Sequence, residues 1–154
     1  PSREVRRVPW DPGAADGRAD LMVDFSDLLG QPYKLHSVDC STVAEEINRR
    51  LGKEVPPTTF FRAVGSEGHL GEVEEYLTEE GWQRVGDTFR EATREGDLVL
   101  VDPAGKGLAR GLWTLVESRS GTFLTATPAH GIVAMKRSAA QGFAHSVHGV
   151  YRLA

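Results

Sequence analysis

The second half of the chain alternates short apolar runs with turn residues, and this pattern restricts the fold more than any other feature of the sequence. The runs are rich in valine, leucine and threonine, and glycine, proline or serine residues separate them. Short strands joined by turns of about two to five residues are typical of an antiparallel sheet. The sequence therefore predicts a five-strand antiparallel sheet, with strands at 97–102, 111–117, 122–127, 131–136 and 147–153.

The first half carries the helical signals. Val43, Ala44, Ile47 and Leu51 recur at the spacing that places apolar side chains on one face of a helix, and a glycine follows as a stop signal. This pattern predicts a helix at 41–51. Similar reasoning predicts shorter helices at 21–30 and 69–80, a helical turn at 87–94 and a short strand at 82–85.

Helices in the first half followed by strands in the second predict an α+β fold rather than a doubly wound sheet. A chain of 154 residues is long enough for one domain with a hydrophobic core. The prolines and glycines near the N-terminus, among them Pro9, Pro12 and Gly17, predict an extended segment. The expected organisation is an N-terminal arm at 1–20 and a single α+β domain at 21–154.

Composition excludes several classes of protein. The net charge of −4 gives no electrostatic basis for binding nucleic acid. No apolar run approaches the ~18 residues of a membrane span, and no apolar segment typical of a secretion signal follows the charged N-terminus. The single cysteine cannot form an internal disulfide. We therefore expect a protein without a membrane span or a secretion signal.

That cysteine, Cys40, falls where a loop turns into the helix at 41–51. Unpaired N–H groups and the helix dipole at a helix N-terminus favour a thiolate, so this is a place where a catalytic cysteine would be built. Cys40 is therefore a candidate nucleophile. Alternatively, a lone cysteine is a small buried apolar side chain. Asp39, directly before it, is a good N-cap residue in either case.

The order of several short motifs resembles one enzyme family. Gly-Gln-Pro-Tyr at 30–33, Asp-Cys-Ser-Thr-Val at 39–43 and Glu-Gly-Asp-Leu-Val-Leu at 95–100 are followed by the predicted antiparallel strands. This order resembles the NlpC-type papain-like cysteine peptidases, which cleave peptide bonds in bacterial cell walls. The resemblance covers roughly residues 25–153, with an insertion-like middle at 56–90. It implies a papain-like α+β fold with N-terminal helices and a five-strand sheet, and Cys40 as the nucleophile.

The resemblance also implies a histidine base at the start of the second strand and a third polar residue on the next strand. Gly111 or Leu112 takes the place of the base, and Thr125 takes the place of the third residue. The expected geometry has Cys40 at the start of the central helix, with Gly111 and Thr125 opposite it. Because acyl transfer to water needs an acid to protonate the leaving amine, we expect catalysis to be degenerate.

Two other histidines are candidates for the base. His130 lies in the turn after the third predicted strand, and His36 lies on the loop four residues before Cys40. His145 and His148 have a spacing of three, but no carboxylate or cysteine nearby completes a metal site. We therefore expect no metal and no cofactor.

Small stand-alone versions of the family resemble domains encoded by tailed bacteriophages. This analogy predicts a virion component used in tail assembly or at the tail tip, with other tail proteins or further copies of the chain as partners. The first alternative is an active cysteine peptidase or amidase that cleaves the stem peptides of peptidoglycan. The second is an unrelated cytosolic α+β binding domain.

Overall fold

The structure is a computed structural model that describes residues 24–119 and 121–154. The arm expected at 1–20 and the start of the helix expected at 21–30 lie outside the described residues. The described part forms the following helices and strands in chain order: η3 (Ser26–Leu28), α1 (Cys40–Arg50), α2 (Phe60–Val64), α3 (Leu70–Glu79), β1 (Trp82–Gly86), η4 (Phe89–Glu91), β2 (Leu98–Val101), η5 (Ala109–Gly111), β3 (Trp113–Arg119), β4 (Thr122–Thr127), β5 (Gly131–Lys136), α4 (Arg137–Ala140), η6 (Gln141–Ser146) and β6 (Val147–Leu153).

The strands form one antiparallel sheet whose spatial order differs from the order along the chain, and the α+β class is confirmed. The sheet has six strands in the order β1-β6-β2-β3-β4-β5, where the sequence predicted five. The five predicted strands are all present, and the short strand predicted at 82–85 joins them as the edge strand β1. The predicted simple meander holds only for β2 to β5. β6 instead returns to the other side of β2, where Val150 of β6 pairs with Val99 of β2.

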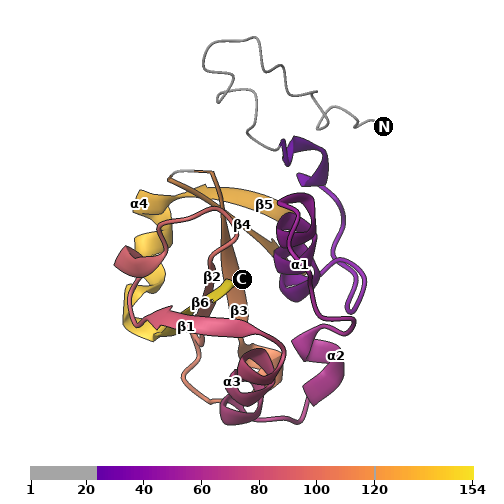
Figure 1. Cartoon of the computed structure of the whole chain (residues 1–154), viewed down its shortest axis with the longest axis vertical. Helices are drawn as coiled ribbons and strands as arrows, with labels where there is room; N and C mark the ends of the chain where they lie inside the picture. Colours follow the sequence, from indigo (N-terminus) through magenta and orange to yellow (C-terminus); the bar gives the residue numbers. More distant parts are fainter. Residues whose placement is uncertain (1–23, 120) are drawn as a thin grey trace.

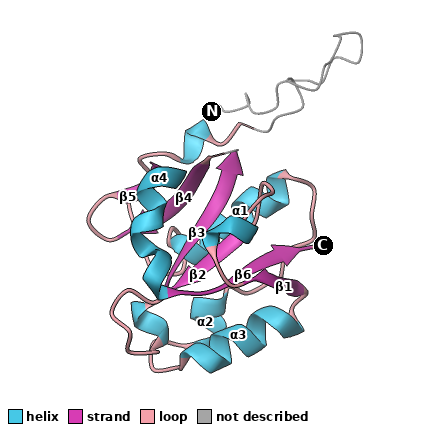
Figure 2. Cartoon of the chain, turned by 90° about the vertical axis from the view of Figure 1, so that its left-hand side faces the viewer, coloured by secondary structure: helices cyan, strands magenta, loops and turns pink. Residues whose placement is uncertain are grey.

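Helices cover both faces of this sheet. α1 packs against β3 and β4, while α2 and α3 pack on each other and α3 also contacts β1. α4 and η6 lie on the opposite side of the sheet from α1 (Figure 1). In Figure 2, α4 faces the viewer and α1 lies behind the strands. No helix within the described ranges is long and apolar enough to cross a membrane.

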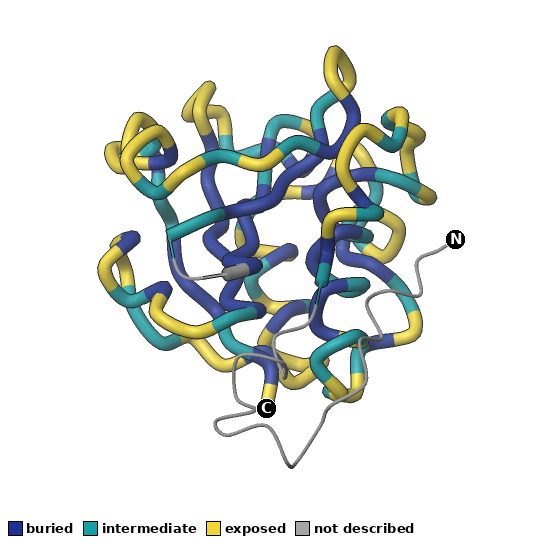
Figure 3. The backbone as a smooth tube through the Cα atoms, turned by 90° about the horizontal axis from the view of Figure 1, so that it is seen from above, coloured by how far each residue is buried: buried dark blue, intermediate teal, exposed yellow. Residues whose placement is uncertain are grey.

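The sheet separates two apolar clusters, and β2 contributes to both. Leu98 and Leu100 pack on the side of α1, whereas Val99 and Val101 pack on the side of α4. Side chains alternate between the faces of a strand, so a strand buried on both faces needs an unbroken apolar run. The run Leu-Val-Leu-Val satisfies this requirement. Figure 3 shows buried backbone through the centre of the molecule and exposed loops around it.

The glycine and aspartate before β2 have structural roles. Gly96 has φ +92°, and a Cβ there would lie 2.6 Å from the Asn48 side chain of α1. The Asp97 carboxylate is fully buried and accepts hydrogen bonds from the Thr93 and Arg94 N–H groups. It also accepts two 2.8 Å hydrogen bonds from Arg152 of β6. Asp97 thus joins the turn before β2 to the final strand.

Two helical segments differ from the sequence predictions. The helix expected at 21–30 is, in its described part, only the single 3₁₀ turn η3, which ends before Gly30 at φ +84°. α2 was not predicted, because the segment around Pro56 and Pro57 carries no helical periodicity. Its start is fixed instead by Thr59, whose hydroxyl accepts a hydrogen bond from the Arg62 N–H.

Replacing Asp97 should destabilise the fold strongly. Asp97→Ala removes the acceptor for four hydrogen bonds and leaves Arg152 without its carboxylate partner. We expect a loss of about 3 kcal/mol in the free energy of unfolding, measured by urea denaturation. Asp87→Ala is the matched control, because the Asp87 side chain is 77% exposed in its ion pair with Arg84. It should cost less than about 1 kcal/mol, and equal losses in the two variants would contradict the assigned role of Asp97.

Candidate functional site

Asp39 fixes the start of α1. One oxygen of its carboxylate accepts hydrogen bonds from the Ser41 and Thr42 N–H groups, both at 3.0 Å, and from the Ser41 hydroxyl at 2.6 Å. The Thr42 hydroxyl accepts a 2.9 Å hydrogen bond from the Asp39 N–H, which completes a capping box. Cys40 is therefore the first residue of the helix, which begins one residue earlier than the predicted 41–51.

The Cys40 side chain is turned into the protein, against β3. It is 3% exposed. The Thr114 N–H donates a 3.3 Å hydrogen bond to the Cys40 sulfur, and the Thr114 hydroxyl donates a 3.0 Å hydrogen bond to the Cys40 carbonyl oxygen. A single strand residue therefore holds both the thiol and the first peptide group of α1.

Burial controls the ionisation of this thiol. The pKa of Cys40 is raised to about 12, chiefly by burial and to a smaller extent by the nearby Asp39 carboxylate, while the hydrogen bonds from Thr114 oppose the rise. The position of Cys40 at a helix N-terminus predicted a lowered pKa, and that expectation is wrong. The burial that accompanies this contact with the sheet keeps the thiol protonated at neutral pH.

The residues expected opposite Cys40 lie elsewhere. Gly111 belongs to η5, before β3 begins, and the strand residue at the thiol is Thr114. Thr125 lies between Leu124 and Ala126, which both pack in the cluster on the side of α1. Since side chains alternate along a strand, Thr125 points to the opposite face of the sheet. Within the described residues neither Gly111 nor Thr125 hydrogen-bonds to Cys40, and Thr114 holds the thiol instead.

The two candidate bases do not hydrogen-bond to the thiol in the described structure. The His36 N–H donates a 2.7 Å hydrogen bond to Asp39, and the backbone of His36 has φ 70°. The Nδ1 atom of His36 is buried and has no hydrogen-bond partner in the described part of the chain. His130 is exposed in the turn between β4 and β5, with Nδ1 3.5 Å from the Thr127 hydroxyl. His36 and His130 therefore hydrogen-bond to Asp39 and Thr127, not to Cys40.

The other two histidines considered as metal ligands lie at the end of the chain. His145 is in η6 and His148 is in β6. Over residues 24–119 and 121–154, no group of three or more histidine, cysteine, aspartate or glutamate side chains is arranged to hold a metal ion.

Tyr33 is a neighbour of the thiol that the sequence did not assign to the site. Burial raises the pKa of the Tyr33 hydroxyl, with smaller contributions from the charges of Asp39 and Cys40. Its position in the motif Gly-Gln-Pro-Tyr was the available signal, since that motif directly precedes the loop to Cys40. Nothing in the sequence around Thr114 indicated a place in the site, because only the packing of β3 against α1 brings Thr114 to the thiol.

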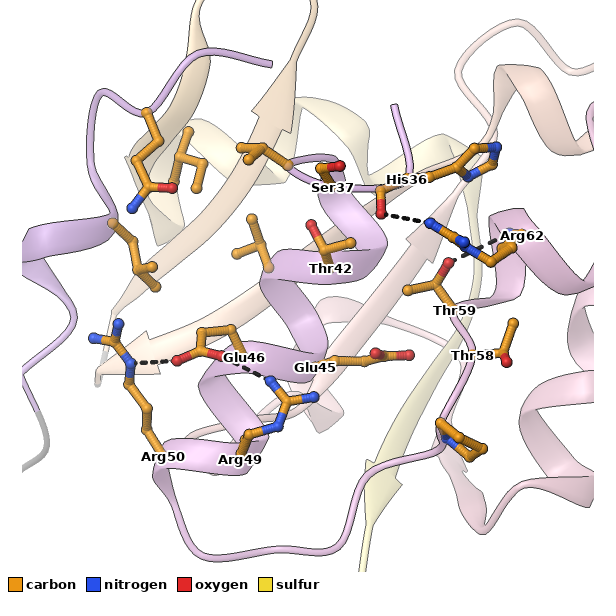
Figure 4. Close-up of a pocket in the computed structure, with 16 residues that line it drawn as sticks. His36, Ser37, Thr42, Glu45, Glu46, Arg49, Arg50, Thr58, Thr59 and Arg62 are labelled. Atoms are coloured by element: carbon orange, nitrogen blue, oxygen red, sulfur yellow. Dashed lines mark hydrogen bonds and ion pairs between the residues drawn. The ribbon is translucent and has the colours of Figure 1, made fainter. Parts of the chain in front are cut away.

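A pocket of about 550 Å³ lies on the other side of α1 (Figure 4). Its walls come from the outward face of α1, from the loop around His36 and Ser37, and from residues 57–59 with Arg62 of α2. Cys40 is not part of its lining. The helix therefore presents its buried thiol to the sheet and a polar cavity to its outer side.

Glu45 lines this pocket and, among the described residues, its carboxyl group has neither a hydrogen bond nor an ion pair. Its neighbour Glu46 forms ion pairs with Arg49 at 2.7 Å and with Arg50 at 2.8 Å. Glu45 is half-buried, and burial raises the pKa of its carboxyl group to about 7, although Arg49 opposes this shift. Sequence reasoning missed Glu45 because nothing in the sequence shows that residues 57–62 cover this part of the helix.

Comparison with known proteins gives no further identification. The chain matches no protein-family model, and no curated protein is significantly similar to it. The chemistry of the site therefore has to be inferred from its geometry. That geometry combines a protonated thiol held by Thr114 with a separate polar pocket of mixed charge.

The thiol should react very slowly in the folded protein. With a pKa of about 12 instead of the ordinary 9.0, the thiolate fraction at pH 8 falls about a thousandfold. We expect iodoacetamide to label folded Cys40 at least that much more slowly than the chain unfolded in urea. The control is Ser66→Cys in a Cys40→Ala background, because Ser66 is exposed and its replacement should label quickly. An apparent pKa below 8 for folded Cys40 would contradict this picture of the site.

Glu45 should make stability fall as the pH rises. Because the pKa of Glu45 is raised from 4.5 to about 7, the folded state favours the protonated form. The resulting stabilisation is complete below pH 4.5 and is lost by about pH 7. Glu45→Gln abolishes this loss, so the variant should gain roughly 1 kcal/mol relative to the wild type between pH 4 and pH 8. Urea denaturation at both pH values measures the difference, and parallel pH profiles would disprove it.

Proposed function

We propose that the chain is a non-catalytic relative of the NlpC-type papain-like cysteine peptidases that serves as a structural component of a bacteriophage tail. The observation that carries the non-catalytic part is the state of Cys40. The thiol is buried, protonated at neutral pH and hydrogen-bonded to the backbone of Thr114. A nucleophile needs the opposite: access to substrate, a thiolate and an adjacent base.

The arrangement around the cysteine supports descent from such an enzyme. An Asp-Cys pair starts a helix that lies against an antiparallel sheet, and the Gly-Asp-Leu run enters the strand next to β3. Both motifs keep a structural role, one as a helix cap and one as a buried ion pair. The motif residues that would build the scaffold of such an enzyme therefore have structural roles in this chain. The position that would supply the catalytic base carries no histidine.

An active peptidase is the alternative that this geometry disfavours. Cleavage of an amide requires a group that accepts the proton of the nucleophile and returns it to the leaving amine. Asp39 is the titratable group whose charge acts on Cys40, and its carboxylate already accepts hydrogen bonds from Ser41, Thr42 and His36. Both oxygens of the Asp39 carboxylate thus accept hydrogen bonds that fix the start of the helix, and Asp39 serves as a cap.

The role in a tail rests on the motif resemblance and is compatible with a loss of catalysis. A domain inside an assembly contributes its surface and stability, and neither requires a reactive thiol. The pocket on the outer side of α1 offers such a domain a means of binding.

A hydrolysis assay tests the loss of catalysis. We expect purified peptidoglycan to release no peptide fragments above background with this chain, and we expect the wild type and Cys40→Ala to give the same result. A working peptidase of the same family provides the positive control. Hydrolysis by the wild type that Cys40→Ala abolishes would overturn the proposal in favour of an active enzyme.

Mass spectrometry of purified virions tests the structural role separately. A fixed copy number of the chain relative to the major tail protein would support it. Absence of the chain from intact particles, together with its presence in the host cytosol, would favour a cytosolic binding domain instead.

A further inference from the structure

The pocket on the outer side of α1 has the size of a small-molecule site. Its volume of about 550 Å³ lies within the range of about 300–1,000 Å³ found for ligand pockets. Most of its lining comes from α1, the loop before α1 and the segment from Pro57 to Arg62, and Leu28, Gln31 and Ile132 complete it. Figure 4 shows the Glu45 side chain extending from α1 across the cavity toward the wall that carries Thr58, Thr59 and Arg62.

Most charges around this pocket already have partners. Glu46 pairs with Arg49 and Arg50, and Arg50 also forms hydrogen bonds to both oxygens of Asp27, at 2.5 and 2.8 Å. These contacts form a closed network along one side of α1. They leave no carboxylate of that network for a ligand.

Arg62 lies outside this network, and Glu45 makes no hydrogen bond to it, although the charge of Arg49 lowers the pKa of the Glu45 carboxyl group. In the described structure the Glu45 carboxylate makes no hydrogen bond, and Arg62 forms no ion pair. Arg62 uses one guanidinium nitrogen, which donates a 3.2 Å hydrogen bond to the His36 carbonyl oxygen. The guanidinium group carries five N–H donors, so most of its capacity is unused. Glu45 and Arg62, which both have hydrogen-bonding groups without partners in the described structure, thus line the same cavity.

Holding an unpaired carboxylate in a half-buried position costs free energy, as the raised pKa of Glu45 indicates. Such a group in a pocket is typical of a site that a ligand completes. The pairing of one free acid with one free base also restricts the ligand. A polyanion would meet Glu45, and a polycation would meet Arg62, so like charges would oppose either.

We propose that this pocket binds a small zwitterionic ligand of the size of a dipeptide, whose free amino group pairs with Glu45 and whose carboxylate pairs with Arg62. The guanidinium fork suits a carboxylate because it offers two parallel hydrogen bonds. The hydroxyl groups of Ser37 and Thr58, which also line the pocket, supply polar contacts for a peptide group between the two ends. Cys40 lies outside this pocket, so the inference holds whether or not the thiol reacts.

Titration with three dipeptide probes tests each end of the ligand. The probes are L-alanyl-L-alanine, its N-acetyl derivative and its C-terminal amide, and the observable is the backbone amide spectrum of the full chain. We expect saturable shifts at Glu45, Thr58 and Arg62 with the free dipeptide. Each blocked derivative should bind about tenfold more weakly, because it loses one charge-assisted pair.

Two variants assign the ends. Glu45→Gln should weaken the free dipeptide about tenfold and abolish its advantage over the N-acetyl form, and Arg62→Gln should do the same relative to the amide. Both variants should fold, since Arg62 is exposed and Glu45→Gln removes an unfavourable buried charge. The matched controls are Glu79→Gln and Arg110→Gln, which are exposed and lie outside the pocket lining, and they should leave all three affinities unchanged.

Several results would overturn the proposal. One is a shift pattern that does not saturate or that lies away from the pocket. Another is equal affinity for all three probes, and a third is equal binding by wild type and both variants. The peptidoglycan assay is independent of these outcomes, because it reports only on the thiol.

Discussion

The contact between the first turn of α1 and the middle of the sheet is the interaction on which the remaining arrangement depends. Thr114 holds the Cys40 sulfur and carbonyl oxygen, while Asp39 closes the helix start from the other side. The apolar face of α1 packs against β3 and β4, and its residues Val43 and Ile47 are buried in the cluster between the helix and the sheet. Because the helix is fixed at this end, its opposite face is presented to residues 57–62, and the outer pocket forms between them.

The competition at Cys40 is decided by magnitude. A helix N-terminus favours a nearby negative charge by about 0.3–1 kcal/mol. A rise of the thiol pKa from 9.0 to about 12 corresponds to roughly 4 kcal/mol against ionisation. Burial against the sheet therefore outweighs the helix dipole several times over, and the capping carboxylate of Asp39 acts in the same direction as burial. A cysteine at a helix start is activated only when solvent or a cationic partner reaches it.

The sequence predicted most of the fold because its local signals were strong. The turn-punctuated strands and the 41–51 helix depend on periodicity within a few residues, and the structure contains them. Local signals could not show that β6 passes to the far side of β2, since that depends on which edge is free after β2 to β5 have paired. α2 was missed for a related reason: its five residues are too few for a periodic pattern, and tertiary contacts with α3 stabilise it.

The site was harder to predict than the fold, because its properties arise from contacts between distant segments. Cys40 and Thr114 are 74 positions apart, and a shift of one residue in β3 would turn Thr114 to the other face of the sheet. Glu45 is an ordinary helix residue in sequence, and it becomes a half-buried carboxyl group only because residues 57–62 fold over it. One helix thus separates the two parts of the site. Its inner face carries a cysteine whose reactivity is suppressed by packing, and its outer face carries Glu45, whose carboxyl group makes no hydrogen bond within the described residues. The cap, the sheet contact and the pocket do not depend on the thiol being ionised, so this part of the fold is compatible with a protonated Cys40.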